Sequence, residues 1–445
     1  MRELPSGWIE APPIELLEQS IGGVWGKPPG EQEADVTVVR VADFRDDGTI
    51  NLATAPRRSI TSNQLLTRKL CRDDLLLEKS GGGPTKPVGR VVRGKQTSGS
   101  VVPTNFVQLL RPSSHVDADY LFWWLWWSHL NGSSAEFQRA TTNIRNLRVG
   151  DYLNRKAPVP PLSEQRRIVA AIEEQFSRLN AADASLDQAR SRLQGLGSAV
   201  VTSCLEGDWP LVRWKDAGRS QNGRAFPSKD YSLEGIQLLR PGNLSASGRV
   251  EWKADNSRRL PERYAEQHPR FLVGANEVVM NLTAQSLKDE FLGRVCLTGA
   301  GERCLLNQRI ARLTPNDAEP RFVLYVFKSR RFRDFVKSLN TGSLIQHMFT
   351  SQLDEFELPV PPLEEQRRIV AEVEERLSVI DAMRASIARA ERRSATLRRS
   401  ILERAFRGEL VPQDPSDEPA SVLLARIRAG RELADALPRR RRVSA

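Results

Sequence analysis

The 445-residue sequence has few of the residues that build disulfides, metal sites and acid–base active sites. Its four cysteines and four histidines are scattered, and no CxxC pair or other metal-ligand spacing connects them. The N-terminus has no apolar segment of the kind found in secretion signals. The longest aromatic run, Tyr120 to Trp127, is far shorter than the roughly 20 residues of a membrane span. These absences predict a cytoplasmic protein without membrane contact, structural zinc or a bound cofactor.

Positive charge is what the chain has in excess. Lysine and arginine number 66 against 55 acidic residues, which gives a net charge of +11. Of these cations 54 are arginine, whose planar guanidinium suits phosphates and guanine edges. The charge predicts a polyanionic partner such as nucleic acid. A membrane surface, an acidic protein or a GC-rich coding sequence would also explain it.

An internal repeat organises the sequence. Residues 158–170 read PVPPLSEQRRIVA and residues 359–371 read PVPPLEEQRRIVA, so 12 of 13 positions are identical at an offset of 201. The same register pairs Trp8 with Trp209 and Gly207 with Gly408. A period near 200 indicates a duplicated unit rather than a solenoid. Each half is therefore expected to be a globular domain followed by a long helix.

Hydrophobic periodicity predicts the elements inside each half. Short apolar runs between Gly, Pro and Asn clusters indicate strands, and residues 119–130 and 320–339 indicate helices. The aromatic run at 120–127 is better explained by a buried helix than by base stacking. After each proline pair, apolar positions recur at spacings of three and four, a pattern typical of coiled coils. The seam positions are Leu179, Ala182, Leu186, Ala189, Leu193, Leu196 and Val200, then Ile380, Met383, Ile387, Ala390, Ser394, Leu397 and Ile401. We expect the two seams to pack together, the alternative being that each docks on another protein.

Motifs of catalysis are weak. Residues 89–95 read GRVVRGK, the spacing of a phosphate-binding loop, but Gln96 stands where a Mg²⁺-ligating Ser or Thr belongs. The sequence contains no HExxH, no GxSxG and no Asn-Pro-Pro-aromatic tetrad of an amino-methyltransferase. A DNA-recognition subunit without catalysis therefore fits best. A self-contained DNA-modifying enzyme and a basic coiled-coil scaffold are the alternatives.

Several segments together resemble the specificity subunits of type I restriction-modification systems. They are the doubled PVPPLxEQRRIVA blocks, the opening LPSGW, the stretch from Asp74 to Arg90 (DLLLEKSGGG to VGR), and DEPASVLLARI at Asp417 to Ile427. The resemblance implies an α+β fold with two similar mixed α/β target-recognition domains, at 1–157 and 208–358. Two long antiparallel helices, at 158–207 and 359–410, would separate them as a coiled coil. A tail with a short helix would follow at 411–445.

The resemblance also implies function. Members of the family catalyse nothing themselves; they bind a bipartite, asymmetric double-stranded DNA target. They carry two modification subunits, which bind S-adenosylmethionine and methylate adenine, and two ATP-driven restriction subunits in the complete enzyme. The glycine-rich SGGG of the first half is replaced by TAQSLKDEFLG at 283–293, which implies different half-sites. The helices are expected to set the gap between them.

Candidate DNA-contacting residues are polar and basic side chains in predicted loops, each of which could instead be an ordinary surface residue. In the first half they are Arg57, Arg58, Asn63, Lys79, Lys86, Arg93, Lys95, Gln96, Thr142, Asn143, Arg145 and Asn146. In the second half they are Asn222, Arg224, Asn281, Gln285, Lys288, Asn307, Gln308, Ser343, Gln346 and His347. Partner subunits are expected on two equivalent surfaces, formed by Glu164, Gln165, Arg166 and Arg167 and by Glu365, Gln366, Arg367 and Arg368.

Overall fold

The computed structural model describes residues 4–81, 87–94, 99–140, 144–285, 290–339 and 346–436. It divides into two units. Unit 1 comprises Met1–Ser185 together with Ala390–Ala445, and unit 2 comprises Leu186–Arg389. Each unit contains both sheets and helices, which confirms the predicted α+β class.

Unit 1 is built around two sheets. The larger has the order β2-β9-β5-β7 and the smaller the order β4-β3-β8. Their strands are β2 (Leu17–Gly22), β9 (Val107–Pro112), β5 (Leu75–Glu78), β7 (Val91–Arg93), β4 (Arg57–Ile60), β3 (Ala34–Val39) and β8 (Val101–Pro103). Further pairings join β1 (Ile9–Ala11) to β12 (Ala157–Val159), and β10 (Gln138–Ala140) to β11 (Arg145–Leu147) and β6 (Ser80–Gly81). Helices are α1 (Ser62–Arg68), α2 (Ala118–Leu130), α3 (Val149–Asn154) and α12 (Ala420–Ala436).

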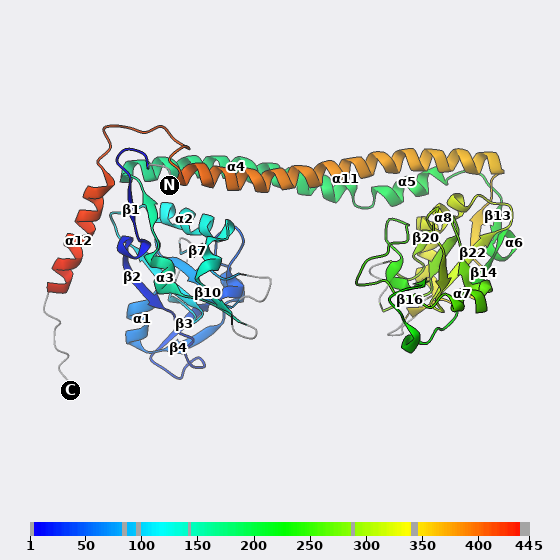
Figure 1. Ribbon diagram of the computed structural model, residues 1–445, viewed down its shortest axis with the longest axis horizontal. Coiled ribbons are helices and arrows are strands. Elements are labelled where there is room, and N and C mark those ends of the chain that lie inside the picture. The colour runs from blue at the N-terminus through cyan, green and yellow to red at the C-terminus, as the bar shows by residue number, and fades with distance from the viewer. Residues whose placement is uncertain are drawn as a thin grey trace. The chain divides into compact units, whose positions relative to one another are not determined.

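The three leucines of strand β5, residues 75–77, are all buried because both faces of the strand are covered. Leu75 and Leu77 face the core beneath helix α2, and Leu76 faces a second core on the side of β3 and β8. Helix α2 lies over the large sheet (Figure 1) and buries Tyr120 to Leu125. The aromatic run is thus a core helix, as expected.

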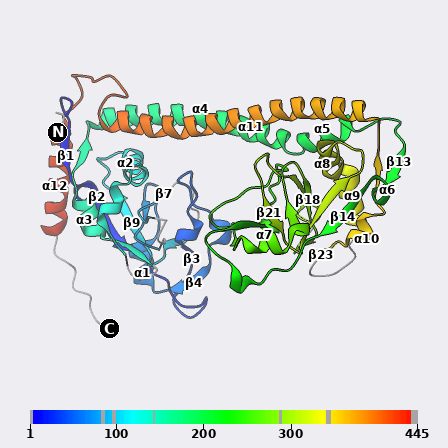
Figure 2. The same cartoon turned by 45° about the vertical axis from the view of Figure 1, so that its right-hand side comes forward.

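Unit 2 repeats this topology. Its sheets have the orders β14-β22-β18-β20 and β16-β15-β21-β17. The strands are β14 (Gly218–Asn222), β22 (Ile310–Pro315), β18 (Val278–Asn281), β20 (Val295–Leu297), β16 (Arg259–Leu260), β15 (Ile236–Leu239), β21 (Cys304–Leu306) and β17 (Leu272–Val273). Strand β13 (Leu211–Arg213) pairs with β24 (Glu357–Pro359), and β19 (Thr283–Ala284) with β23 (Gln346–His347). The helices are α6 (Trp214–Ala217), α7 (Arg263–Gln267), α8 (Pro320–Lys328), α9 (Arg330–Leu339) and α10 (Thr350–Leu353). Helix α8 packs against the sheet of β14, β22, β18 and β20 (Figure 2), as α2 packs against the larger sheet of unit 1.

The long helices are α4 (Leu162–Leu193), α5 (Leu196–Cys204) and α11 (Leu363–Phe406). Within unit 1, α4 and α11 run antiparallel, and Arg398 contacts Asp183 at 2.7 Å. Within unit 2, the Arg384 guanidinium donates to the carbonyl of Leu193 at 3.2 Å. The predicted antiparallel pairing is confirmed inside each unit.

The predicted seam is correct only in part. Leu193, Ile380, Ser394 and Ile401 are buried, whereas Ala182, Leu196, Met383 and Leu397 are exposed. A pair of helices encloses only a narrow line of side chains, so several seam positions face solvent. Gly195, in the left-handed conformation with φ of 76°, also separates α4 from α5, and Val201 is then buried rather than Val200.

Candidate nucleic-acid interface

In each unit a glycine lets two segments cross in close contact. Gly23 follows β2, and a Cβ atom there would lie 2.2 Å from the carbonyl oxygen of Pro103. Gly223 follows β14, and a Cβ atom there would lie 2.2 Å from the carbonyl oxygen of Asn307. Only glycine permits this approach. The crossing places the turns after β8 and β21 beside the ends of β2 and β14.

A second segment joins the crossing in unit 1. The amides of Lys79 and Ser80 donate to the carbonyl of Phe106 at 3.0 and 3.2 Å, and the amide of Leu147 donates to the carbonyl of Lys79 at 2.8 Å. The Ser80 hydroxyl donates to Asn146 Oδ1 at 2.6 Å. We call residues 104–106 the turn arm of unit 1 and residues 144–148 its strand arm.

Unit 2 has the same arms with different side chains. The amide of Leu282 donates to the carbonyl of Arg309 at 2.9 Å, and the amide of Met348 donates to the carbonyl of Leu282 at 2.9 Å. Residues 307–309 are therefore its turn arm and residues 346–349 its strand arm. Lys79 of unit 1 corresponds to the buried Leu282, and Phe106 corresponds to the exposed Arg309.

The unit 2 arms gather several predicted residues. The amide of Gln308 donates to the carbonyl of Arg224 at 3.0 Å, which joins the turn arm to the segment after β14. Asn222 Nδ2 donates to Thr350 Oγ1 at 3.5 Å, next to the strand arm. The residues brought together are Asn222, Arg224, Asn307, Gln308 and His347. Gln285 is exposed beside β19, the backbone of Gln346 lies in β23, and Lys288 and Ser343 fall outside the described residues.

In unit 1 the arms bring together Lys79, Arg145 and Asn146. Lys79 is half-buried with its Nζ atom 3.5 Å from Gln108 Oε1, and burial lowers the pKa of its ammonium. Arg57, Arg58 and Asn63 lie elsewhere, on β4 and α1, where the Arg58 guanidinium lies 4.3 Å from the ring of Trp25. Lys86, Lys95, Gln96, Thr142 and Asn143 fall outside the described residues, as does the end of the GRVVRGK loop.

Arg93, predicted as a DNA contact, makes internal contacts in unit 1. Its guanidinium lies 3.9 Å from the ring of Phe122 and pairs with Asp119 at 3.0 Å and with Glu173 at 3.6 Å. Burial lowers the pKa of Arg93, and these acids partly oppose the effect. The side chain braces β7 against α2 and α4.

Asn281, also predicted as a DNA contact, makes internal hydrogen bonds in unit 2. It is fully buried, and its Nδ2 atom donates to the carbonyls of Thr283 at 2.7 Å and Phe291 at 2.8 Å. The side chain closes the loop between β18 and β20.

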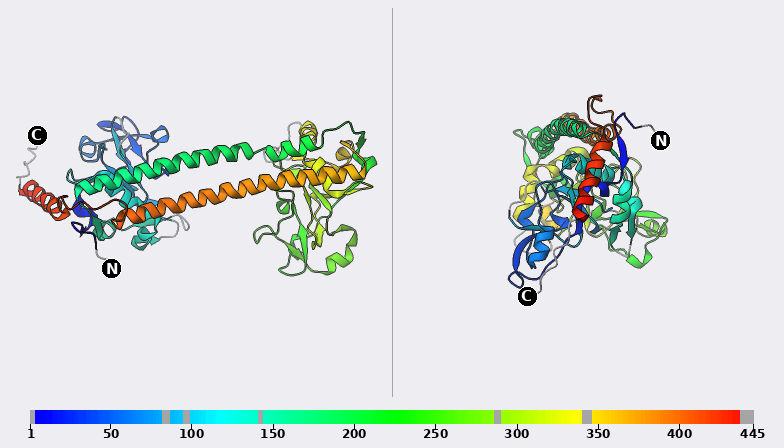
Figure 3. Two further views of the ribbon diagram at one scale, coloured as in Figure 1. Left: turned by 90° about the horizontal axis from the view of Figure 1, so that it is seen from above. Right: turned by 90° about the vertical axis from the view of Figure 1, so that its left-hand side faces the viewer.

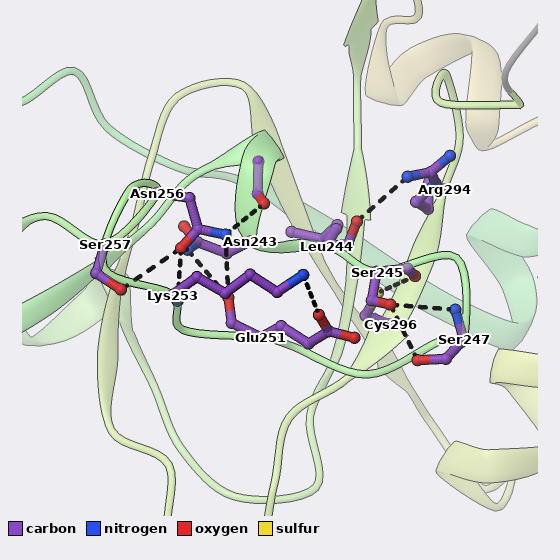
Figure 4. A network of polar contacts seen from close by, with 11 residues as sticks. Asn243, Leu244, Ser245, Ser247, Glu251, Lys253, Asn256, Ser257, Arg294 and Cys296 are labelled. Atoms are coloured by element: carbon purple, nitrogen blue, oxygen red, sulfur yellow. Dashed lines mark hydrogen bonds and ion pairs between the residues drawn. The ribbon is translucent and has the colours of Figure 1, made fainter. Parts of the chain in front are cut away.

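In unit 2, a network of hydrogen bonds holds the loop that follows β15 (Figure 4). The buried Asn243 accepts from the amide of Arg240 at 2.9 Å and donates to Asn256 Oδ1 at 3.1 Å. Lys253 pairs with Glu251 at 2.9 Å in the same loop. In unit 1, the buried Asp43 accepts from the amide of Arg40 at 2.8 Å. These hydrogen bonds fix the loops that flank β3 and β15.

The glutamines of the repeated blocks have internal roles. Gln165 Oε1 accepts from the amide of Asp117 at 2.9 Å, and its Nε2 donates to the carbonyl of Pro160 at 2.9 Å. Gln366 makes the same pair of bonds with Glu319 at 2.9 Å and Pro361 at 2.8 Å. Asp117 and Glu319 are the N-caps of α2 and α8. Both glutamines are buried. Each links its long helix by hydrogen bonds to the N-terminus of α2 or α8, and its side chain faces inward rather than toward a partner.

The first block is covered by the chain's own tail. Glu164 accepts from Trp8 Nε1 at 2.9 Å and from Gln413 Nε2 at 2.7 Å, and its burial raises the pKa of its carboxyl. Arg167 pairs with Asp417 at 2.6 Å. Helix α12 continues along the N-terminal segment (Figure 3), where Arg428 pairs with Glu15 at 2.7 Å.

In the second block Glu365 pairs with its own neighbour, Arg368, at 2.6 Å. The two blocks therefore differ within the described residues, because the tail contacts Glu164 and Arg167 of the first block. The expectation of two equivalent partner surfaces stays a prediction. Arg166 and Arg367 are exposed in both copies.

The described residues contain neither a membrane-spanning helix nor a metal-binding cluster. No helix among them is long and apolar enough to cross a membrane. No cluster of three or more His, Cys, Asp or Glu side chains among them could hold a metal ion.

Comparison with known proteins shows that this chain is similar to the specificity subunits of type I restriction-modification systems. The model of the type I restriction modification DNA specificity domain matches residues 206–392. The chain is 24% identical to the StySPI specificity subunit of Salmonella potsdam, over 96% of each chain. This relative is named as a specificity subunit and not as a catalytic subunit.

Two solved structures share the fold. One, described under complex assembly and conformational transition of the type I R-M system, covers 92% of this chain and all of its own with a TM-score of 0.72 at 19% identity. The other, the HsdS subunit of Thermoanaerobacter tengcongensis, covers 92% of this chain and 98% of its own with a TM-score of 0.54 at 19% identity.

Proposed function

We propose that this chain is the DNA specificity subunit of a type I restriction-modification enzyme and reads a bipartite double-stranded target. The observation that carries the proposal is the duplicated pair of arms, which holds different side chains in the two units. One backbone frame bearing Lys79, Arg145 and Asn146 in unit 1 and Arg224, Asn307 and His347 in unit 2 suits two unlike half-sites. We retain the domain bounds 1–157 and 208–358, the helices at 158–207 and 359–410, and the tail at 411–445.

Catalysis would belong to partner subunits. The names of the relatives and the absence of a catalytic motif in the sequence support this. A modification subunit would dock on the helices, where unit 2 offers an open groove of about 650 Å³. The groove is lined by Leu193, Leu196, Val379, Met383 and Ile387, so it suits an apolar helix face. Two modification subunits, joined by two restriction subunits in the complete enzyme, would complete the assembly.

The test is reconstitution in a host free of adenine methylation. The chain expressed with its modification subunit should methylate one bipartite motif, identified by single-molecule sequencing. The chain alone, incubated with S-adenosylmethionine and plasmid, should leave the DNA unmodified. Methylation by the purified chain alone would favour the self-contained enzyme. Absence of any sequence preference in the assembled complex would favour the scaffold.

A further inference from the structure

Phenylalanine is almost entirely an interior residue in this protein. All 15 phenylalanines lie within the described residues, and 13 of them are buried or half-buried. The two exceptions are Phe106, which is 47% exposed, and Phe349, which is 59% exposed. One belongs to each unit, and each lies on an arm of the candidate interface. This placement is unexpected for side chains scattered over a surface at random.

Both aromatic residues are held by main-chain bonds at the arms. The carbonyl of Phe106 accepts from the amides of Lys79 and Ser80 at 3.0 and 3.2 Å. Phe349 follows Met348, whose amide donates to the carbonyl of Leu282 at 2.9 Å. The Phe349 ring also packs edge-on against His347, with ring centroids 4.5 Å apart. The backbone bonds fix where each ring leaves the fold while leaving it open to solvent.

The two units interchange aromatic and basic residues between equivalent positions. Phe106 on the turn arm of unit 1 corresponds to Arg309 on the turn arm of unit 2. Phe349 on the strand arm of unit 2 corresponds to Arg148 on the strand arm of unit 1 at the repeat offset of 201. Each unit thus has an exposed ring on one arm and an arginine on the other, of which Arg309 is exposed and Arg148 is half-buried and pairs with Asp151 at 2.5 Å.

Such a pair suits duplex DNA. A phenyl ring has no hydrogen-bonding atom, so its contribution to DNA binding is stacking on a base or insertion between neighbouring base pairs. The arginine and the nearby Lys79 or Arg224 supply the positive charge that holds the flanking phosphates. A protein partner that bound an isolated aromatic ring would not require basic residues around it. The basic residues therefore favour DNA.

We propose that Phe106 and Phe349 are wedge residues, each of which inserts at one base step of its own half-site and unstacks it. The proposal rests on the proposed function, since it assigns a means of DNA deformation to the same interface. The energetic consequence is specificity for base steps that open readily, in addition to hydrogen-bonded readout.

The test uses the complex of this chain with its modification subunit and a duplex carrying the methylated motif. 2-Aminopurine is placed in turn at each position of both half-sites, because its fluorescence rises when stacking is lost. Apart from the adenine that the modification subunit flips out for methylation, the intact complex should give one bright step in each half-site. Phe106→Ala should remove the signal in one half-site only, and Phe349→Ala in the other only. Each change should weaken specific binding roughly ten-fold.

Matched variants separate this role from a general loss of exposed apolar surface. Leu130→Ala in unit 1 and Leu233→Ala in unit 2 remove exposed leucines away from the arms, and should alter neither signal nor affinity. Phe106→Trp, which keeps an aromatic face, should retain the unstacked step.

The outcomes distinguish the two proposals. If the complex shows no preference for the motif over random duplex, the proposed function fails. If binding is specific but no step is unstacked, or both phenylalanine variants keep the signals, the wedge proposal is overturned. It is equally overturned if the variants weaken only assembly with the modification subunit, because the rings then face protein.

Discussion

Replacing Gln165 by alanine is expected to loosen helix α2 of unit 1 without changing the surface of the repeated block. The substitution removes the bonds to the amide of Asp117 and the carbonyl of Pro160. The Asp117 amide lies at the N-terminus of α2 and loses its bonded partner in a partly buried site. Two lost hydrogen bonds and an unsatisfied, partly buried amide together correspond to about 2 to 4 kcal/mol.

The duplication supplies the control for this experiment. Gln366→Ala removes the same two bonds from α8 in unit 2. Hydrogen exchange followed by mass spectrometry reports each helix separately, which avoids treating a two-unit chain as two-state. Exchange in residues 118–130 should accelerate roughly 30-fold or more in Gln165→Ala and stay unchanged in Gln366→Ala, with the reverse for residues 320–328. The neighbouring exposed Arg166→Ala should change neither. Unchanged exchange together with weakened binding of the modification subunit would show that Gln165 does not hold α2 in place. Gln165 would then be a docking residue.

Further predictions follow from other contacts. Gly223→Ala should abolish recognition of one half-site and lower unit 2 stability by about 1 to 3 kcal/mol, measured by methylation sequencing and by thermal unfolding, because its Cβ would overlap the Asn307 carbonyl. Arg93→Ala should destabilise unit 1 by about 2 kcal/mol or more, seen in denaturant unfolding, while the methylated motif stays the same, since the residue braces α2. Glu164 and Asp417 predict how tail docking depends on pH. The pKa of the Asp417 carboxyl lies below its ordinary 3.8 because Arg167 donates to it, so its contribution is present above 3.8 and is lost as pH falls through the lower folded value. Burial raises the pKa of Glu164, so its contribution to docking is present below 4.5 and is lost as pH rises through the raised folded value. Proteolysis should therefore find α12 protected down to pH 3.8 and released as pH falls through the lowered pKa of Asp417. Inserting seven residues after Ser185 and seven after Arg389 should lengthen the unread gap of the methylated motif by roughly three base pairs, whereas an unchanged gap would exclude the helices as its determinant.

Sequence patterns predicted the fold well where the signal is local or repeated. Consecutive residues encode three of these features. They are the apolar run in β5, the aromatic helix α2 and the two long helices that follow the repeated proline pairs. The repeat also predicted that the two halves share a topology, which the sheet orders confirm.

Features that depend on distant packing escaped prediction. Arg93 lies in a basic stretch of sequence, but the stacked face of Phe122 and the carboxylates of α2 and α4 draw it inward. Gln165 looked like part of a solvated helix face because its partner, Asp117, is 48 residues away. The roles of Gly23, Gly223, Phe106 and Phe349 rest on contacts or exposure that no local pattern encodes. Comparing the two halves at an offset of 200, one residue less than that of the repeated blocks, could have identified the two glycines.

The separation of DNA recognition between the two units is tested most directly by exchanging one of them. Residues 1–157 would be replaced by the corresponding domain of a relative with a known, different target, and the hybrid expressed with the modification subunit in a methylation-free host. Single-molecule sequencing should then reveal a methylated motif with one half changed to that of the donor and the other half retained. A motif changed in both halves, or unchanged in both, would contradict the assignment of one half-site to each unit.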